Sequence, residues 1–132
     1  LDELLKIADI VGIALPSAPA TYHLMDERRL GLMKQGSYLI NAGRGDAVDM
    51  DALNKVLRIG TSLAGCALDV TEPEPLPPDH PLWDAPRTII TPHIAGGFHL
   101  QETFERLVDI TAANLGRYLA GRQEEMKNVV KH

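Results

Sequence analysis

An α/β fold with a parallel sheet is predicted by three features of the sequence. Short apolar runs alternate with segments of helical periodicity along most of the chain. The apolar runs are nearly continuous, which is typical of parallel strands covered on both faces. Glycines follow the helical segments as stop signals. This alternation favours right-handed crossovers between neighbouring parallel strands.

Four apolar runs are predicted to be strands. Isoleucine, valine, leucine and alanine dominate them, as expected for strands buried in a sheet. We therefore expect about four parallel strands. The first should be an exposed apolar edge, so that the isolated chain associates through it or is marginally folded. The runs cover residues 10–15, 38–41, 63–70 and 88–91.

Three shorter helical segments precede the first three strands or separate them. Asp2 and Asp49 are candidate N-caps, because a short carboxylate accepts hydrogen bonds from first-turn amides. Gly36 and Gly60 are candidate stops, because glycine adopts the left-handed conformation that ends helices. The segments cover residues 2–7, 26–33 and 49–60.

A long helix is predicted over residues 98–119, with leucines and Phe104 on one face. A helix of this length spans about 30 Å, so we expect it to reach towards another domain or subunit. Residues 71–86 contain six prolines and are predicted to be an ordered loop rather than a helix or central strand.

Composition excludes several classes of protein. Thirteen Lys and Arg against eighteen Asp and Glu give a net charge of −5, which disfavours nucleic-acid binding. No apolar run is long enough to span a membrane. The single cysteine, Cys66, favours a cytoplasmic setting. We expect no metal site, because the five histidines lack metal-ligand spacing: His23, His80, His93, His99 and His132.

Candidate functional residues follow the predicted strands, where parallel sheets bind ligands. Arg44 lies between Gly43 and Gly45, and these glycines favour close approach of the backbone to an anion. Asp69 lies near the end of the third run, and His93 follows the fourth. Each has a structural explanation: a surface arginine, a turn-capping aspartate, a satisfied histidine. Together, at one edge of a sheet, they favour a functional site.

The spaced motifs resemble the D-isomer-specific 2-hydroxyacid dehydrogenases. The resemblance implies a partial Rossmann-type doubly wound parallel sheet of about four strands, with flanking helices and a long C-terminal helix. Residues 1–97 would be the second half of an NAD(P)-binding domain, and residues 98–132 would return to a substrate domain. The main motifs are Leu39-Ile40-Asn41-Ala42-Gly43-Arg44-Gly45, Ala67-Leu68-Asp69-Val70, Glu74-Pro75-Leu76-Pro77 and Thr91-Pro92-His93-Ile94-Ala95-Gly96-Gly97.

The resemblance also implies residue roles. Arg44 would bind the substrate carboxylate and carbonyl, His93 would be the acid/base, and Glu74 would hold the histidine ring. The family glutamate lies five residues after the strand-end Asp69, which selects Glu74 over Glu72, and Glu72 is then expected to be solvated. The implied cofactor contacts are Pro16, Ala42, Gly43, Arg44, Asp69, His93, Ala95 and Gly96.

The implied function is hydride transfer between NAD or NADP and a D-2-hydroxy acid/2-keto acid pair, by a cytoplasmic homodimer with no nucleic-acid or membrane partner. The sequence contains no G-x-G-x-x-G phosphate-binding motif. We therefore expect the chain to be part of a larger enzyme and to be inactive alone. The alternative is a non-catalytic nucleotide-binding or protein-interaction module of the same fold.

Overall fold

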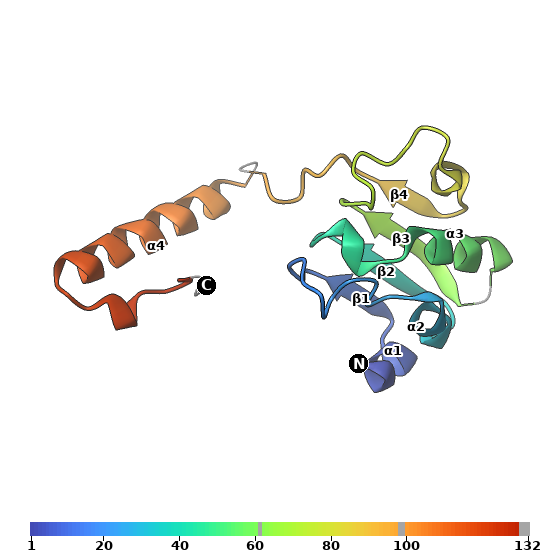
Figure 1. Cartoon of the computed structure of the whole chain (residues 1–132), viewed down its shortest axis with the longest axis horizontal. Helices are drawn as coiled ribbons and strands as arrows, with labels where there is room; N and C mark the ends of the chain where they lie inside the picture. The colour runs from blue at the N-terminus through green and yellow to red at the C-terminus, as the bar shows by residue number, and fades with distance from the viewer. Residues whose placement is uncertain (61, 98–99, 130–132) are drawn as a thin grey trace. The chain divides into compact units, whose positions relative to one another are not determined.

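The computed structural model of the chain describes residues 1–60, 62–97 and 100–129 (Figure 1). They divide into two compact units, Leu1–Gly96 and Gly97–His132. The first unit holds the sheet, and the second holds a long helix. No helix within the described residues is long and apolar enough to cross a membrane.

One parallel sheet organises the first unit, as the sequence predicts. Its strands pair in chain order, β1-β2-β3-β4, so β1 is an edge strand. Three of the four strands end earlier than predicted, which leaves residues such as Asp69 in the loops beyond the sheet. The strands are β1 (Ile10–Ile13), β2 (Ser37–Asn41), β3 (Leu63–Leu68) and β4 (Thr88–Ile90).

Three helices accompany this sheet: α1 (Asp2–Ile7), α2 (Glu27–Leu32) and α3 (Met50–Ile59). The N-cap of α3 is Asp49, as predicted, and its side chain accepts a hydrogen bond from the Ala52 amide at 3.0 Å. Gly60 ends α3 with φ of 72°, which also confirms the prediction. Asp26 caps α2 in the same way as Asp49 caps α3.

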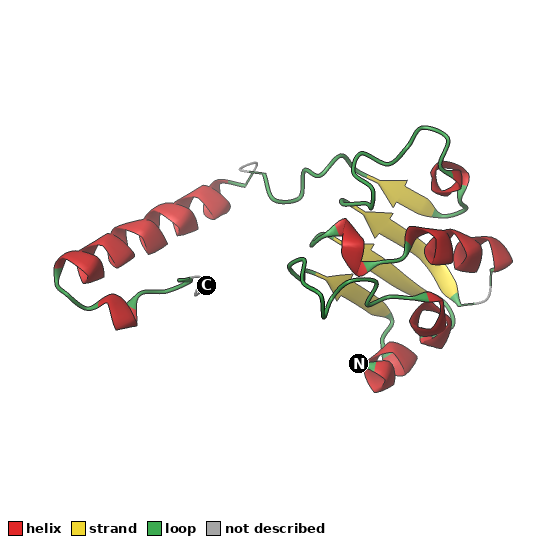
Figure 2. Cartoon of the chain, in the orientation of Figure 1, coloured by secondary structure: helices red, strands yellow, loops and turns green. Residues whose placement is uncertain are grey.

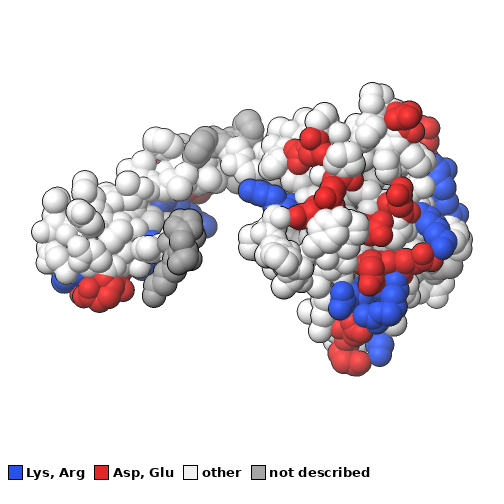
Figure 3. Space-filling model, in the orientation of Figure 1, with Lys and Arg blue, Asp and Glu red and all other residues white. Residues whose placement is uncertain are grey.

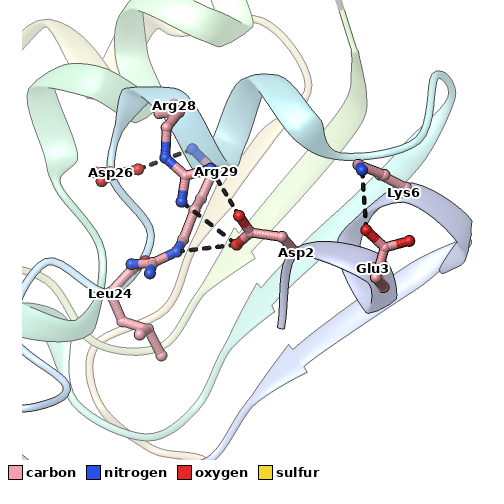
Figure 4. A network of polar contacts seen from close by, with 7 residues as sticks. All are labelled: Asp2, Glu3, Lys6, Leu24, Asp26, Arg28 and Arg29. Carbon is pink, nitrogen blue, oxygen red and sulfur yellow. Dashed lines mark hydrogen bonds and ion pairs between the residues drawn. The ribbon is translucent and has the colours of Figure 1, made fainter.

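Asp2 does not cap α1, because Leu1 occupies the N-cap position and Asp2 is the first helical residue. The Asp2 carboxylate instead accepts hydrogen bonds from Arg28 at 2.8 Å and from Arg29 at 3.4 Å (Figure 4). The hydrogen bond from Arg28 is the main cause that lowers the pKa of Asp2. The prediction of an N-cap was therefore wrong, and Asp2 joins α1 to α2.

Two other local predictions need correction. Gly36 does not cap α2, which ends at Leu32 with Met33 extended; Gly36 has φ of 82° in the turn that enters β2. The proline-rich segment is not entirely loop, because Pro81–Asp84 form a 3-10 helix, η2. His80 caps η2 by accepting a hydrogen bond from the Leu82 amide at 3.1 Å.

The hydrophobic core lies on one face of the sheet. Helices α2 and α3 lie side by side over that face (Figures 1 and 2). Leu30 from α2 and Leu53 from α3 are fully buried with Leu39 of β2 in one cluster. The predicted coverage of both faces was wrong for this chain, because the alternate side chains of the strands are exposed. Those exposed apolar residues are Ile10, Tyr38, Ile40 and Ile89, which we call the bare face.

The second unit consists of α4 (Gln101–Leu119) and a short 3-10 helix, η3 (Gln123–Glu125). Asn114 joins the tail to α4, because its amide oxygen accepts from the Lys127 amide at 2.9 Å and its amide nitrogen donates to the Lys127 carbonyl at 2.8 Å. No residue of α4 is buried, and its leucines are exposed. The predicted helix began at Phe98, but Phe98 and His99 lie outside the described residues.

The charged surface is mixed in sign. In Figure 3, basic and acidic side chains lie interspersed over the first unit rather than in one basic stripe. Several of them form ion pairs across elements, such as Lys55 with Glu27 and Lys34 with Asp9. Such exposed pairs contribute little to stability.

We predict that the bare face makes the isolated chain associate. Replacing Ile89, which is 63% exposed on the bare face, with lysine should weaken association at least about tenfold, because a charge then lies on the apolar surface. The control is Ile59→Lys, since Ile59 is 60% exposed at the end of α3. Sedimentation equilibrium measures both, and a monomeric wild-type chain would contradict the prediction.

Candidate active site

A pocket of about 710 Å³ lies beyond the carboxyl ends of the strands in the first unit. Three sequence-predicted catalytic residues, Arg44, Glu74 and His93, line it together with Asp69. They come from the loops after β2, β3 and β4, so the parallel sheet brings them together as predicted. The remaining lining is largely apolar and consists of Thr71, Pro75, Leu76, Trp83, Ile90, Thr91 and Pro92.

Arg44 is held by the turn that follows β2. Asn41 is fully buried at the end of the strand, where its side chain donates to the Arg44 carbonyl at 2.9 Å and accepts from the Gly43 amide at 3.1 Å. The exposed Arg44 guanidinium donates to the Gly43 carbonyl at 2.9 Å. Among the described residues it has no carboxylate partner, so this cation remains available to an anionic ligand.

Protein packing requires the two glycines beside Arg44, a reason that the sequence did not indicate. A Cβ at Gly43 would lie 2.7 Å from both the amide nitrogen and the carbonyl oxygen of Leu15. A Cβ at Gly45 would lie 1.9 Å from the Thr71 carbonyl oxygen. The loop after β2 can therefore contact the loop after β3 only without a side chain at residue 45.

Asp69 organises the loop after β4. One carboxylate oxygen, Oδ1, accepts hydrogen bonds from the Thr91 hydroxyl at 2.6 Å and the Ile94 amide at 2.9 Å, and Oδ2 accepts from the Ala95 amide at 2.8 Å. Burial by itself raises the pKa of Asp69. The hydrogen bonds from Thr91 and the two amides, with the nearby His93, outweigh burial and lower the pKa overall.

His93 lies against Glu74. The ring nitrogen Nδ1 is 2.7 Å from Oε1 of Glu74, and both side chains are partly exposed to the pocket. The His93 amide donates to the Asp69 carbonyl at 2.9 Å, and its φ of 54° is left-handed. A non-glycine residue in this conformation is uncommon and is held by its surroundings. The second ring nitrogen, Nε2, has no hydrogen-bond partner among the residues that the structure describes, so it is available to a ligand.

Two side chains between β3 and β4, Trp83 and Glu72, make contacts that the sequence did not indicate. Trp83 lines the pocket, and its indole nitrogen donates to the Pro77 carbonyl at 2.8 Å. Glu72 is not simply solvated, because its Oε2 lies 3.2 Å from Nε2 of His23. The Glu72–His23 contact joins residues 49 apart, a contact that local sequence patterns do not indicate.

The expected cofactor contacts all follow strands, but they do not all line this pocket. Arg44, Asp69 and His93 line it, while five others lie outside its lining. Those five are Pro16, Ala42, Gly43, Ala95 and Gly96. Of these, Gly43 is buried, and the others are exposed at the same edge of the sheet.

Residues 1–95 match the family model described as D-isomer specific 2-hydroxyacid dehydrogenase, NAD binding domain. The chain belongs to this dehydrogenase family. It is 47% identical over 121 residues to a glyoxylate reductase of Thermofilum pendens, an alignment that covers 92% of this chain and 35% of that protein. This dehydrogenase-family chain thus spans about a third of the length of the curated relatives it matches.

Solved structures place the fold in the same family. A D-isomer specific 2-hydroxyacid dehydrogenase from Xanthobacter autotrophicus, in complex with NADPH and MES, has a TM-score of 0.81 and 36% identity, and the match covers 99% of this chain and 51% of that one. The D-lactate dehydrogenase of Aquifex aeolicus, complexed with NAD and lactic acid, has a TM-score of 0.68 and 33% identity, covering 96% and 41%. The Rossmann-type fold of this chain follows from these structures, and the family model identifies residues 1–95 as an NAD-binding domain.

We predict that Gly45→Ala destabilises the fold by about 3 kcal/mol or more, because the new Cβ collides with backbone atoms that cannot move aside. The matched control is Gly31→Ala in α2, where no atom lies within 4 Å of the added Cβ. That change should stabilise the helix by about 0.5–1 kcal/mol. Denaturant unfolding measures both, and equal free energies of unfolding for Gly45→Ala and wild type would contradict the contact.

We predict that Asp69→Asn costs about 1–3 kcal/mol at neutral pH, because an amide cannot accept all the hydrogen bonds made by the carboxylate. The folded-state pKa of Asp69 is lowered, so the contribution of its charge to stability is complete above the ordinary pKa of 3.8 and is lost as the pH falls through the folded-state pKa.

The difference in unfolding free energy between wild type and Asp69→Asn should therefore shrink in acid. Asp79→Asn, at an exposed loop position, is the control and should show little difference at any pH. If the difference in unfolding free energy between wild type and Asp69→Asn stayed constant from neutral to acidic pH, the charge of the Asp69 carboxylate would not contribute to stability.

Proposed function

We propose that this chain supplies the substrate-binding and acid/base part of an NAD(P)-dependent D-2-hydroxyacid dehydrogenase. One observation carries the proposal: an arginine without a carboxylate partner among the described residues, Arg44, lines the same pocket as the His93–Glu74 pair. A 2-keto acid needs a cation for its carboxylate and a proton for its carbonyl oxygen. Arg44 supplies the cation, and the His93–Glu74 pair supplies the proton.

Arg44 binds the substrate carboxylate in this proposal. A guanidinium presents a planar fork of donors, which matches two carboxylate oxygens or one carboxylate oxygen and the neighbouring carbonyl oxygen. The hydrogen bonds of Asn41 to the turn hold the backbone of Arg44 and leave the guanidinium exposed. Binding by Arg44 thus orients the keto group relative to His93.

His93 holds and moves the proton at Nε2. Glu74 occupies Nδ1, so it orients the ring and favours a proton on that nitrogen, as carboxylates do for catalytic histidines. In reduction Nε2 donates its proton to the carbonyl oxygen, and in oxidation it takes the hydroxyl proton back. An imidazole suits both directions because it titrates near neutral pH.

The residues present fit the nicotinamide end of the cofactor. In the Asp69 carboxylate, Oδ1 accepts two hydrogen bonds but Oδ2 accepts one, which leaves acceptor capacity for an amide group such as the nicotinamide carboxamide. When bound, the nicotinamide ring supplies or accepts the hydride. We propose further backbone contacts to the cofactor from Pro16, Ala42, Gly43, Ala95 and Gly96.

The rest of the enzyme is also part of the proposal. The chain has no G-x-G-x-x-G motif, so the cofactor phosphates need a loop from elsewhere, and we propose that the 132 residues alone do not turn over substrate. Residues 98–132 would return to a substrate domain, and the active protein would be a cytoplasmic homodimer. The buried Cys66 fits a reducing compartment.

The test is steady-state kinetics of the complete protein with NADH or NADPH and either glyoxylate or pyruvate. His93→Ala should lower kcat about 100- to 10,000-fold and leave cofactor binding intact, because it removes the proton donor. Arg44→Ala should lower kcat/KM for the keto acid about 100-fold or more, because it removes two charged hydrogen bonds. Nicotinamide absorbance measures turnover.

Arg28→Ala is the control, because Arg28 is an exposed arginine that binds Asp2 rather than the pocket. It should leave kcat/KM within about twofold of wild type. Near-normal turnover by His93→Ala would overturn the acid/base assignment. Cofactor binding without turnover of any 2-keto acid would favour a non-catalytic nucleotide-binding module.

A further inference from the structure

Glu74 needs support from outside its own side chain to stay against His93. Its side chain is 42% exposed and lies between two buried positions in the loop, Thr71 and Leu76. The Thr71 hydroxyl donates to the Pro73 carbonyl at 3.0 Å, which shapes the loop before Glu74. A partly exposed carboxylate on a loop loses side-chain entropy when it is held at one place, so the surrounding contacts decide how often it meets His93.

Glu72, two residues before Glu74, forms a contact that reaches out of the loop. Its Oε2 lies 3.2 Å from Nε2 of His23, and both side chains are about one third exposed. The only other carboxylate within 4.0 Å of this ring among the described residues is that of Asp49, whose Oδ2 is 3.9 Å from Nδ1. Asp49 already caps α3. His23 therefore lies between the loop after β3 and the start of α3.

His23 is itself held at a defined place. Its amide donates to the Asp46 carbonyl at 2.7 Å, and the neighbouring segment forms a parallel bridge between Met25 and Val48. The Tyr22 ring stacks on the imidazole, with ring centroids 4.1 Å apart and an interplanar angle of 13°. The φ of His23 is 45°, which such constraints maintain. The ring nitrogen Nε2 of His23 is thus held at a defined place, facing the Glu72 carboxylate.

We propose that the His23–Glu72 pair positions Glu74 against His93. His23 and Glu72 are positioning residues, because they act through the loop and touch neither the substrate nor the reacting atoms. The close approach of Gly45 to Thr71 holds the loop backbone on one side, and the His23–Glu72 contact holds it on the other. Removing this contact frees Glu74 to leave Nδ1 of His93.

The test measures which nitrogen of neutral His93 carries the proton, by ¹⁵N NMR of the labelled 132-residue chain. Wild type should carry it mainly on Nδ1, because Nδ1 donates to Glu74. Glu72→Ala should convert His93 to mainly the Nε2–H form. Glu74→Gln is a reference variant that should also weaken the preference for Nδ1–H, because it removes the carboxylate charge beside Nδ1. Glu72→Gln should keep the wild-type form, because its amide oxygen accepts the same hydrogen bond from His23.

Two further variants keep the test decisive. His23→Ala removes the other partner and should give the same loss as Glu72→Ala, with an unchanged melting temperature within about 2 °C for both. Where Glu72→Ala does not fold, Glu72→Asp retains the charge but shortens the reach by one methylene, and it should give an intermediate loss. An unchanged His93 tautomer in folded Glu72→Ala or Glu72→Asp would overturn the proposal.

The catalytic meaning of this positioning rests on the proposed function, whereas the tautomer of His93 is a property of the fold. A protein without dehydrogenase activity whose His93 tautomer still responds to Glu72→Ala would overturn the proposed function and leave the positioning intact. An active enzyme whose tautomer does not respond would overturn the positioning alone. In the complete enzyme, Glu72→Ala should lower kcat more than it changes KM, and Glu72→Gln should restore it.

Discussion

The Thr71 carbonyl occupies the space where a side chain of residue 45 would begin, and the arrangement of the pocket depends on this contact. It brings the turn that carries Arg44 against the loop that carries Glu74. Neither loop belongs to the sheet, so strand pairing alone would not fix their separation. Because Gly45 has no side chain, the two loops can touch, and this contact sets the separation between Arg44 and the His93–Glu74 pair.

Asp69 has the same function for the loop after β4. Its carboxylate accepts the hydroxyl of Thr91 and two backbone amides, and its carbonyl accepts the amide of His93. Asp69 thus holds the left-handed backbone at His93 through both its side chain and its main-chain carbonyl. Together with the packing of Gly45, this makes the pocket a product of loop-to-loop contacts resting on a short parallel sheet.

Much of the fold could be predicted because parallel strands have a local signature. Apolar runs located all four strands, and the capping residues Asp49 and Gly60 bounded α3 correctly. The bare face could not be predicted, because an apolar strand indicates that burial is favourable but not whether a covering helix is present. Asp2 was misassigned because its partners, Arg28 and Arg29, are distant in sequence.

The candidate site divides in the same way. Position after a strand was sufficient to group Arg44, Asp69 and His93, since parallel strands end at one edge. The role of Gly45 and the partner of Glu72 depend on which loops meet, and no local pattern carries that information.

The left-handed backbone at residue 93 also restricts which substitutions evolution can explore there. Asparagine, aspartate and glycine tolerate a φ of 54°, whereas β-branched residues do not. A descendant that loses the imidazole at low structural cost would therefore carry one of those three residues, with the loop of Asp69 unchanged. Such a relative would keep the fold and lose the proton donor. The residue at position 93 would therefore distinguish relatives that retain the acid/base group from relatives that have lost it.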